Sequence, residues 1–254
     1  MRSNSTMAMS DGSAKRGRLF LAGASGAIGT RVIPLLLSGG WHIMGMTRSQ
    51  ERADAMRSKG LDAVVADAFD GKTVNDLIVG FQPDVLMHQL TDLPRDLAKL
   101  DEAALERNAK VRKLGTHNLV EAAKNAGVKR LVVQSIAFDY VPETPRPHKE
   151  GHQLAGRLPG ASATSDGVVS LEDQVSSSGI PFAILRYGRL YGPGTGSDRP
   201  WGPAGIHIDA AALATALAAR SDLSGIFNIT ESDGEVDSSR ARQLLDWNAD
   251  WRTA

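Results

Sequence analysis

Gly23, Gly26 and Gly29 have the spacing of a phosphate-binding turn, in the sequence GASGAIG. In such a turn the first glycine lets the chain bend sharply, the second lets backbone N–H groups approach a pyrophosphate, and the third lets the next helix pack closely. An apolar run at 19–22 predicts a strand before the turn, and a helix is predicted after it. The N-terminus of that helix would offer donors and partial positive charge to the phosphates. This context predicts a dinucleotide site rather than an ordinary loop.

Two charged residues at predicted strand ends bear on which dinucleotide would bind. Arg48 follows the strand expected at 41–46, a position that faces the adenosine ribose in this kind of fold. A basic residue there pairs with a 2′-phosphate, so we expect NADP, with NAD as the less favoured cofactor. A solvated arginine at the start of a helix is the alternative. Asp67 ends the strand expected at 61–67, where it could bind the adenine amino group or cap the next turn.

Polar residues also lie at the ends of the fourth and fifth predicted strands. Thr91 follows the strand expected at 84–90, and Ser135 follows the one at 130–134. Ligands of open α/β sheets bind at the carboxyl ends of the strands, so both side chains are expected near a ligand. His88, inside the fourth strand, is expected to be packed and hydrogen-bonded rather than to bind a ligand.

The elements that must position these residues alternate between strands and helices. Such alternation predicts a Rossmann-type, doubly wound α/β fold with a mostly parallel sheet covered on both faces. The segment 141–167 has no sustained periodicity, so we expect a lid, a binding loop or disorder there. Further helices are expected at 50–58, 73–79, 101–125, 168–178, 209–220 and 238–247, and further strands at 181–187 and 225–230.

The composition excludes several classes of function. The 254 residues include 29 basic and 29 acidic side chains, so no nucleic-acid or anionic-membrane surface is indicated. The absence of cysteine rules out disulfides, thiolate metal sites and cysteine nucleophiles, and no metal site is predicted. Residues 1–16 are small and polar and are expected to be a disordered leader. No apolar run reaches the about 18 residues of a membrane helix, so a cytoplasmic protein that does not bind membranes is expected.

Several motifs, taken in order along the chain, resemble one family. They are GASGAIG, the strand-end Asp67, LGTHNLVEAAKNAGVKRLVVQS, ILRYGRLYGPGTG, IHIDAAALA, GIFNIT and ARQLLDWNADWR. Together they resemble the extended or atypical short-chain dehydrogenases/reductases, which form the nucleotide-sugar epimerase/dehydratase superfamily. The resemblance implies an NAD(P)-binding Rossmann domain at 17–187 with a small, interleaved substrate-binding subdomain at 188–254. It also implies a homodimer through the long helix at 101–125 and the helix that begins at Val168.

The resemblance also implies a set of cofactor contacts. Arg48 would contact the ribose phosphate, and Asp67 with Ala68 would contact the adenine. Leu90 and Thr91 would line the path to the nicotinamide ribose. The remaining residues implied to bind the cofactor are Gly23, Ser25, Gly26, Ala27, Ile28 and Gly29 at the pyrophosphate, and Tyr187 and Arg189 beside the nicotinamide. Ser135 would hydrogen-bond the reacting carbonyl or hydroxyl of the substrate.

The catalytic pair of this family is missing. The family has a tyrosine four residues before a lysine, and the lysine lies four residues before a glutamate that matches Glu172, so the two positions are Thr164 and Val168. The tyrosine must transfer a proton and the lysine must lower its pKa, which threonine and valine cannot do. No shift of register restores the pair, because residues 151–178 contain neither tyrosine nor lysine. An ungapped alignment on Tyr140 would also move the family's serine from Ser135 to Ile136.

Other residues could supply the proton. Tyr140 follows the fifth strand, where it could donate to the substrate or pack over the sheet. His148 and His152 could act as general acids on loop closure, or be solvated loop residues. Tyr191 is expected to be structural. Arg189 could orient an anionic substrate oxygen or form an ion pair.

Three functions stay open on the sequence. The first is an NADP-dependent oxidoreductase or epimerase-like enzyme that acts on a small carbonyl or hydroxyl compound, with Ser135 polarising the oxygen and Tyr140 giving the proton. The second is a regulatory protein that senses NADP, and the third is a non-redox isomerase or cyclase. The chain is short between YGPG and IHIDA, so a small aromatic or polyketide-like substrate is favoured over a UDP-sugar. Only the site can decide between these functions, because one fold hosts many.

Overall fold

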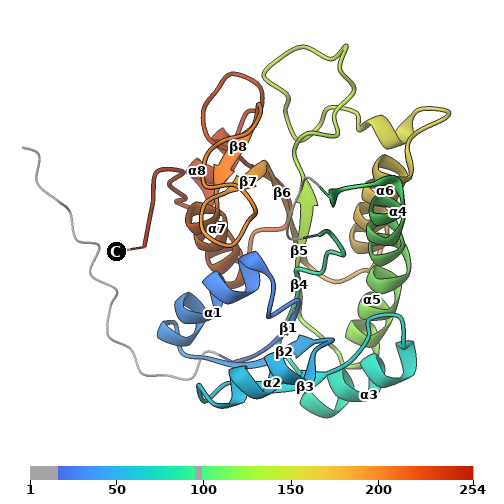
Figure 1. The fold of residues 1–254 in the computed structure, drawn as a ribbon, viewed down its shortest axis with the longest axis vertical. Helices are drawn as coiled ribbons and strands as arrows, with labels where there is room; N and C mark the ends of the chain where they lie inside the picture. Colours follow the sequence, from blue (N-terminus) through green and yellow to red (C-terminus); the bar gives the residue numbers. More distant parts are fainter. Residues whose placement is uncertain (1–16, 95–98, 254) are drawn as a thin grey trace, which may run out of the picture.

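A parallel sheet forms the centre of the molecule in the computed structural model, which describes residues 17–94 and 99–253. Within these residues seven strands are ordered β3-β2-β1-β4-β5-β6-β9 (Figure 1). The strands are β1 Gly17–Ala22, β2 Trp41–Thr47, β3 Asp62–Val65, β4 Val85–His88, β5 Arg130–Ile136, β6 Phe182–Tyr187 and β9 Gly225–Ile229. The order reverses between β1 and β4, and ligands of such sheets bind at this switch point. The predicted Rossmann-type fold class is confirmed.

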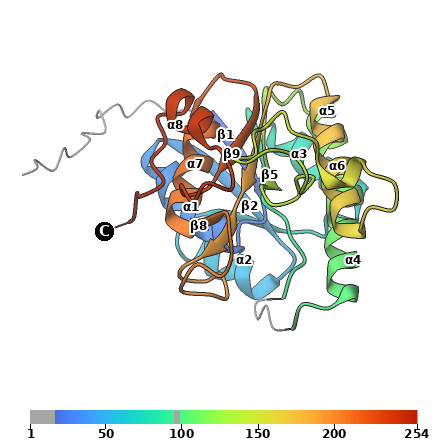
Figure 2. The same ribbon diagram turned by 90° about the horizontal axis from the view of Figure 1, so that it is seen from above.

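Helices cover both faces of the sheet (Figures 1 and 2). On one face α1 (Ala27–Ser38) packs against α7 (Ile208–Arg220), and on the other α3 (Gly71–Phe81) packs against α5 (Thr116–Asn125), beside α6 (Ala163–Ser176). Two further helices are short. α2 (Gln50–Arg57) contacts β2 and β3, and α8 (Ser239–Leu244) contacts β9. Because both faces are covered, the central strands are apolar throughout rather than alternating.

A π-helical turn interrupts the long helix that the sequence predicted at 101–125. α4 (Glu102–Lys110) begins where the Asp101 carboxylate accepts the Ala104 N–H at 2.7 Å, and the turn Val111–Gly115 joins it to α5. An insertion of this kind shifts the side chains relative to a regular helix and is frequent at functional sites. Here it accompanies Arg112, which is only 4% exposed.

α6 begins at Ala163, earlier than predicted, so the prediction that 141–167 lacks regular structure is wrong in part. Ser162 caps the helix, and its Oγ accepts the Ser165 N–H at 3.1 Å. The first turn faces the protein with small residues rather than large apolar ones. A Cβ on Gly167 would lie 3.1 Å from Ala109 Cα, so α6 packs closely on α4 without an apolar pattern that the sequence could reveal. A short 3₁₀ turn, Ala155–Arg157, lies in the same segment.

Residues 188–253 complete the sheet and add a small second one. β9 pairs with β6 in the main sheet, whereas β7 (Arg189–Tyr191) and β8 (Gly205–His207) form a two-stranded parallel pair. The predicted leader at 1–16 lies outside the described residues. None of the helices in the described ranges is long and apolar enough to cross a membrane.

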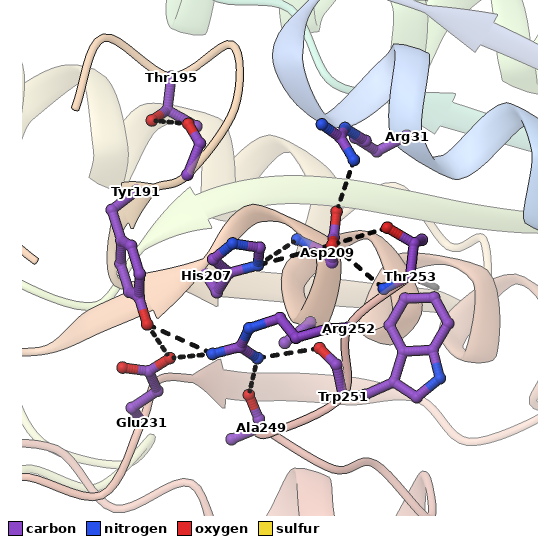
Figure 3. Close-up of polar contacts among 12 residues, drawn as sticks. Arg31, Tyr191, Thr195, His207, Asp209, Glu231, Ala249, Trp251, Arg252 and Thr253 are labelled. Carbon is purple, nitrogen blue, oxygen red and sulfur yellow. Dashed lines mark hydrogen bonds and ion pairs between the residues drawn. The ribbon is translucent and has the colours of Figure 1, made fainter. Parts of the chain in front are cut away.

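Polar contacts fasten the C-terminal segment onto this second sheet (Figure 3). Asp209 accepts hydrogen bonds from Arg31 at 2.9 Å and from the Thr253 hydroxyl at 2.9 Å. Burial raises the pKa of Asp209, but the hydrogen bonds from Thr253 and the charge of Arg31 outweigh it, so the pKa lies below its usual value. Nearby, Tyr191 donates to Glu231 at 2.7 Å, and Arg252 contacts both side chains. These contacts join residues 252 and 253 to α7, to β7 and to the segment after β9, and Tyr191 has the structural surroundings expected for it.

Candidate functional site

A cavity of about 320 Å³ lies where the carboxyl ends of β1, β2, β3 and β4 meet. Its position at the switch point of the sheet is the one expected for a dinucleotide. Eight of the residues predicted to bind the cofactor line it: Gly23, Ser25, Gly26, Arg48, Asp67, Ala68, Leu90 and Thr91. The prediction did not include several other lining residues, among them Thr47, Ser49, Arg52, Gln89 and Val111.

The glycine turn packs so closely on the protein backbone that two of its positions have no space for a side chain. Gly23 has φ +92°, and a Cβ there would lie 2.6 Å from the Gln89 carbonyl oxygen. A Cβ on Gly29 would collide with the Gly23 carbonyl oxygen and lie 2.7 Å from that of Ala24. α1 starts after Gly26 with no side chain capping it, so its first N–H groups are available to an anion. Ala27, Ile28 and Gly29 form this first turn and do not themselves line the cavity.

Two arginines line the cavity at the end of β2. Arg48 donates from Nη2 to Asp92 Oδ1 at 2.9 Å, and this hydrogen bond raises the pKa of Arg48. Arg52 lies one turn further along, on α2, whose N-cap Ser49 accepts the Arg52 N–H. Arg52 could have been predicted as a second basic residue of this site, because it lies four residues after Arg48, in the first turn of the helix that follows. The pair and the N-terminus of α2 can hold an anion together.

Asp67 takes the turn-capping position that the sequence left open. Its Oδ1 accepts the Phe69 N–H at 2.9 Å, while the residue also lines the cavity. The neighbouring Ala68 carbonyl accepts a hydrogen bond from Asn118 at 2.8 Å. The strand end is therefore fixed before any ligand binds.

The end of β4 presents one polar atom without a partner. Gln89 Oε1 is buried and accepts no hydrogen bond from the described residues. Gln89 itself lines the cavity, so this buried acceptor belongs to a residue that a bound ligand would meet. Leu90 is held in place by Gln134, which donates to its carbonyl oxygen at 2.6 Å. The prediction for His88 is confirmed: it is 1% exposed and bonded to Thr116 at 3.0 Å.

Tyr187 and Arg189 do not line this cavity. Tyr187 is 2% exposed, and its hydroxyl shares a hydrogen bond of 2.7 Å with the Thr215 hydroxyl inside the core. Burial raises the pKa of Tyr187 far above its ordinary value. Arg189 lies beyond the carboxyl end of β6, stacked on Phe138. Their expected contact with a nicotinamide stays a prediction.

The two candidate catalytic hydroxyls lie in one buried network, and neither lines the cavity. Ser135 donates to Glu172 Oε1 at 2.7 Å, and Glu172 pairs with Arg186. Arg186 also donates to the Tyr140 hydroxyl at 2.9 Å, and Tyr140 donates to Asn228 Oδ1 at 2.6 Å. Burial raises the pKa of Tyr140, although Arg186 opposes this effect. The structure therefore brings Ser135 and Tyr140 together and gives each hydroxyl a structural partner.

The positions of the missing tyrosine and lysine lie beside this network. Val168 is 1% exposed and packs with Tyr140 in a small apolar cluster. The Thr164 carbonyl accepts a hydrogen bond from Arg112 at 3.3 Å, which is the one hydrogen bond of the Arg112 side chain among the described residues. Burial lowers the pKa of Arg112 to about 10, although Asp139 and Glu172 raise it. The sequence analysis did not predict that Arg112 is buried. Regular helical periodicity does not describe this position, because Arg112 lies in the π-helical turn.

The loop histidines are packed more closely than a solvated loop would be. His148 is 7% exposed and stacks on Tyr140 with ring centroids 5.0 Å apart. Burial lowers its pKa. His152 contacts the same two rings edge-on. Both histidines lie next to the buried network rather than on the cavity.

The fold and the cavity together define a dinucleotide-binding Rossmann protein. A family model described as NAD(P)H-binding matches residues 23–219, and the chain belongs to this family, within the short-chain dehydrogenase/reductase superfamily. The predicted resemblance is thereby confirmed.

Relatives and solved structures agree with this assignment. The chain is 37% identical over 238 residues to a Streptomyces protein named 3-diazoavenalumate denitrifying reductase. The aligned region covers 85% of this chain and 76% of the Streptomyces protein. The chain is 26% identical over 195 residues to UDP-glucose 4-epimerase of Mycolicibacterium smegmatis, covering 74% of this chain and 60% of that one. The crystal structure of the Bordetella bronchiseptica enzyme WbmH in complex with NAD⁺ matches with a TM-score of 0.70 at 22% identity, over 91% of this chain and 79% of that one. The protein is thus an NAD(P)-binding member of a family of reductases and epimerases.

Proposed function

We propose that this protein is an NADP-dependent reductase that reduces a small electrophile, such as a diazo compound, without a proton donated by a tyrosine. The observation that carries the proposal is the engagement of Ser135 and Tyr140 in the buried network with Glu172, Arg186 and Asn228. Both residues are buried, and the sequence has no tyrosine–lysine pair to replace them. A reaction that needs no such donor fits this site best.

The chemistry of a diazo group meets this condition. The Streptomyces relative is named as a reductase that removes nitrogen from a 3-diazo compound. When hydride adds to a diazonium group, R–N₂⁺ becomes neutral R–N=N–H, which loses N₂ and leaves R–H. The hydride itself neutralises the positive charge, so no proton is consumed. Reduction of a ketone differs, because it creates an alkoxide that a general acid must protonate.

The residues of this chain would hold the cofactor and leave the chemistry to it. Bound NADPH would supply the hydride. The glycine turn and the N-terminus of α1 would bind its pyrophosphate. Gln89 Oε1, which has no partner among the described residues, would accept a hydrogen bond from a donor group of the cofactor such as a ribose hydroxyl. Arg48 and Arg52, which both line the cavity beside the N-terminus of α2, support the choice of NADP over NAD.

The test begins with fluorescence titrations of NADPH and NADH, followed by a labelled turnover. We expect NADPH to bind more tightly than NADH, and Arg48→Ala to remove most of that preference. The enzyme is then mixed with deuterium-labelled NADPH and 4-carboxybenzenediazonium. The expected result is oxidation of NADPH with release of N₂ above an enzyme-free control. Turnover should be slower with the deuterium-labelled cofactor; the label itself is not followed into the product, because the N–D of R–N=N–D exchanges with water.

Two outcomes would favour the other functions. Reduction of an aromatic ketone that Tyr140→Phe abolishes would show that Tyr140 is a proton donor and would overturn the proposal. Failure of the folded protein to bind either cofactor would favour a non-redox isomerase or cyclase. Tight NADPH binding with no turnover of either substrate would favour a redox sensor.

A further inference from the structure

Arg189 lies between two exposed aromatic rings. Its guanidinium carbon is 4.4 Å from the centre of the Phe138 ring and 5.6 Å from that of Trp201. Phe138 is 41% exposed and Trp201 is 48% exposed, which is unusual for side chains of this size. The three residues come from different segments, after β5, at the start of β7 and in the loop between β7 and β8. They form an open patch with a cation at its centre.

This patch lies over the edge of the sheet where a substrate would meet the cofactor. Phe138 follows the carboxyl end of β5, and Arg189 follows the carboxyl end of β6. A backbone hydrogen bond joins these two strand ends, because the Ala137 N–H donates to the Tyr187 carbonyl at 2.8 Å. The cavity described above ends at Gln89, Leu90 and Thr91, after the neighbouring strand β4. The patch therefore continues the ligand-binding edge beyond the cofactor cavity.

The surroundings of Arg189 fix its position and leave donors available. Nη1 donates to the Pro203 carbonyl at 2.7 Å, and Trp201 is held by its own hydrogen bond to the Leu190 carbonyl at 3.1 Å. A guanidinium stacked on a ring keeps its in-plane N–H groups free for a bidentate partner. Within the described residues no carboxylate forms an ion pair with Arg189, so the ion pair considered from the sequence is not formed. Arg186, by contrast, donates to Glu172, to Tyr140 and to the Glu150 carbonyl.

We propose that Phe138, Arg189 and Trp201 form a substrate subsite for a planar aromatic carboxylate. The rings would stack on the aromatic part of the ligand, and the Arg189 fork would bind its carboxylate. The inference rests on the proposed function, because it names the substrate class of the same cleft. It explains why two large aromatic side chains stay exposed around an arginine that has a single acceptor among the described residues.

The experiment measures binding of trans-cinnamate by calorimetry, with NADP⁺ present, in comparison with the neutral cinnamamide and the non-aromatic cyclohexanecarboxylate. We expect cinnamate to bind at least about tenfold more tightly than either analogue, because only cinnamate satisfies both the rings and the cation. Arg189→Gln should remove the preference for cinnamate over cinnamamide. Arg199→Gln is the matched control, because Arg199 lies exposed on the loop that carries Trp201 and contacts no aromatic ring among the described residues.

Trp201 supplies a second, optical readout. Cinnamate should quench the fluorescence of the wild-type protein, and Trp201→Phe should lose this quenching. Equal binding of cinnamate and cinnamamide, or unchanged cinnamate binding in Arg189→Gln, would overturn the subsite. Because the NADPH titration is made separately, a protein that binds cinnamate through Arg189 but not NADPH would keep the subsite and reject the reductase.

Discussion

Glu172 and Arg186 form a two-point ion pair inside the protein, with Nε–Oε1 and Nη2–Oε2 distances of 2.9 and 2.6 Å. Both side chains are almost fully buried, at 6% and 4% exposure. The pair joins α6 to β6, and through Ser135 it also reaches β5. It lies between the sheet and α6, the helix that carries Thr164 and Val168.

Removing the charge of Glu172 should destabilise the fold strongly. Glu172→Gln leaves Arg186 as a buried cation with a weakened partner, and loss of one member of such a pair costs about 3–5 kcal/mol. Urea unfolding followed by circular dichroism measures the change. Asp173→Asn is the control on the next residue, because Asp173 pairs with Arg157 at the surface, where the cost should stay below about 1 kcal/mol. Equal effects of both variants would contradict a structural role for the buried pair.

Ser135→Ala and Tyr140→Phe should affect stability more than catalysis. Each substitution removes a buried hydrogen bond, which costs about 1–3 kcal/mol when a charged partner is left behind. Because both residues are buried and both hydroxyls already have hydrogen-bond partners in the protein, kcat on a diazonium substrate should change only a few-fold. Unfolding curves and steady-state kinetics of the same preparations separate the two effects. A loss of kcat by several hundredfold with unchanged stability would instead assign the proton donor to one of them.

Gly29→Ala should abolish cofactor binding, whereas Gly80→Ala should not. A Cβ at Gly29 collides with the Gly23 carbonyl and must push α1 away from the turn that holds the pyrophosphate. Gly80 lies in α3, and a Cβ there meets nothing within 4 Å, so alanine should stabilise the helix by up to about 1 kcal/mol. NADPH titration and thermal melting of both variants test this pair. Wild-type NADPH affinity in a folded Gly29→Ala protein would exclude the turn as the phosphate site.

His88 should make the protein less stable as the pH falls below neutrality. Burial, helped by the charge of Arg112, lowers the pKa of His88 to about 3, whereas an unfolded histidine titrates near 6.5. Between about pH 6.5 and 3 the unfolded chain therefore binds one more proton, and stability falls by up to about 1.4 kcal/mol per pH unit. His88→Asn should remove this dependence. Free energies of unfolding at pH 7 and pH 5 measure it, and parallel losses in both proteins would show that other groups are responsible.

Local patterns in the sequence were enough to locate the cofactor turn, and long-range contacts were needed for the rest. The Cβ clash at Gly29 comes from Gly23 and Ala24, within six residues, and Gly23 has a positive φ in the same turn, so local spacing predicts both glycines. The orientation of Ser135 depends on Glu172, 37 residues away, and no pattern reveals that contact. The start of α6 was not predicted for a related reason. Gly167 lets α6 pack closely on α4, and such a contact between small residues leaves no apolar periodicity in the sequence.

The surroundings of Val168 have a consequence for how this lineage could change. Placing tyrosine at 164 and lysine at 168 would restore the residues of a typical member of the superfamily, but not its site. A lysine at 168 would have to push its ammonium group through a closed apolar cluster toward Tyr140, whose ring already faces the Arg186 guanidinium at 5.2 Å. The tyrosine–lysine chemistry is therefore not two substitutions away. Its introduction would require the Glu172–Arg186 pair and the Tyr140 loop to be rebuilt together.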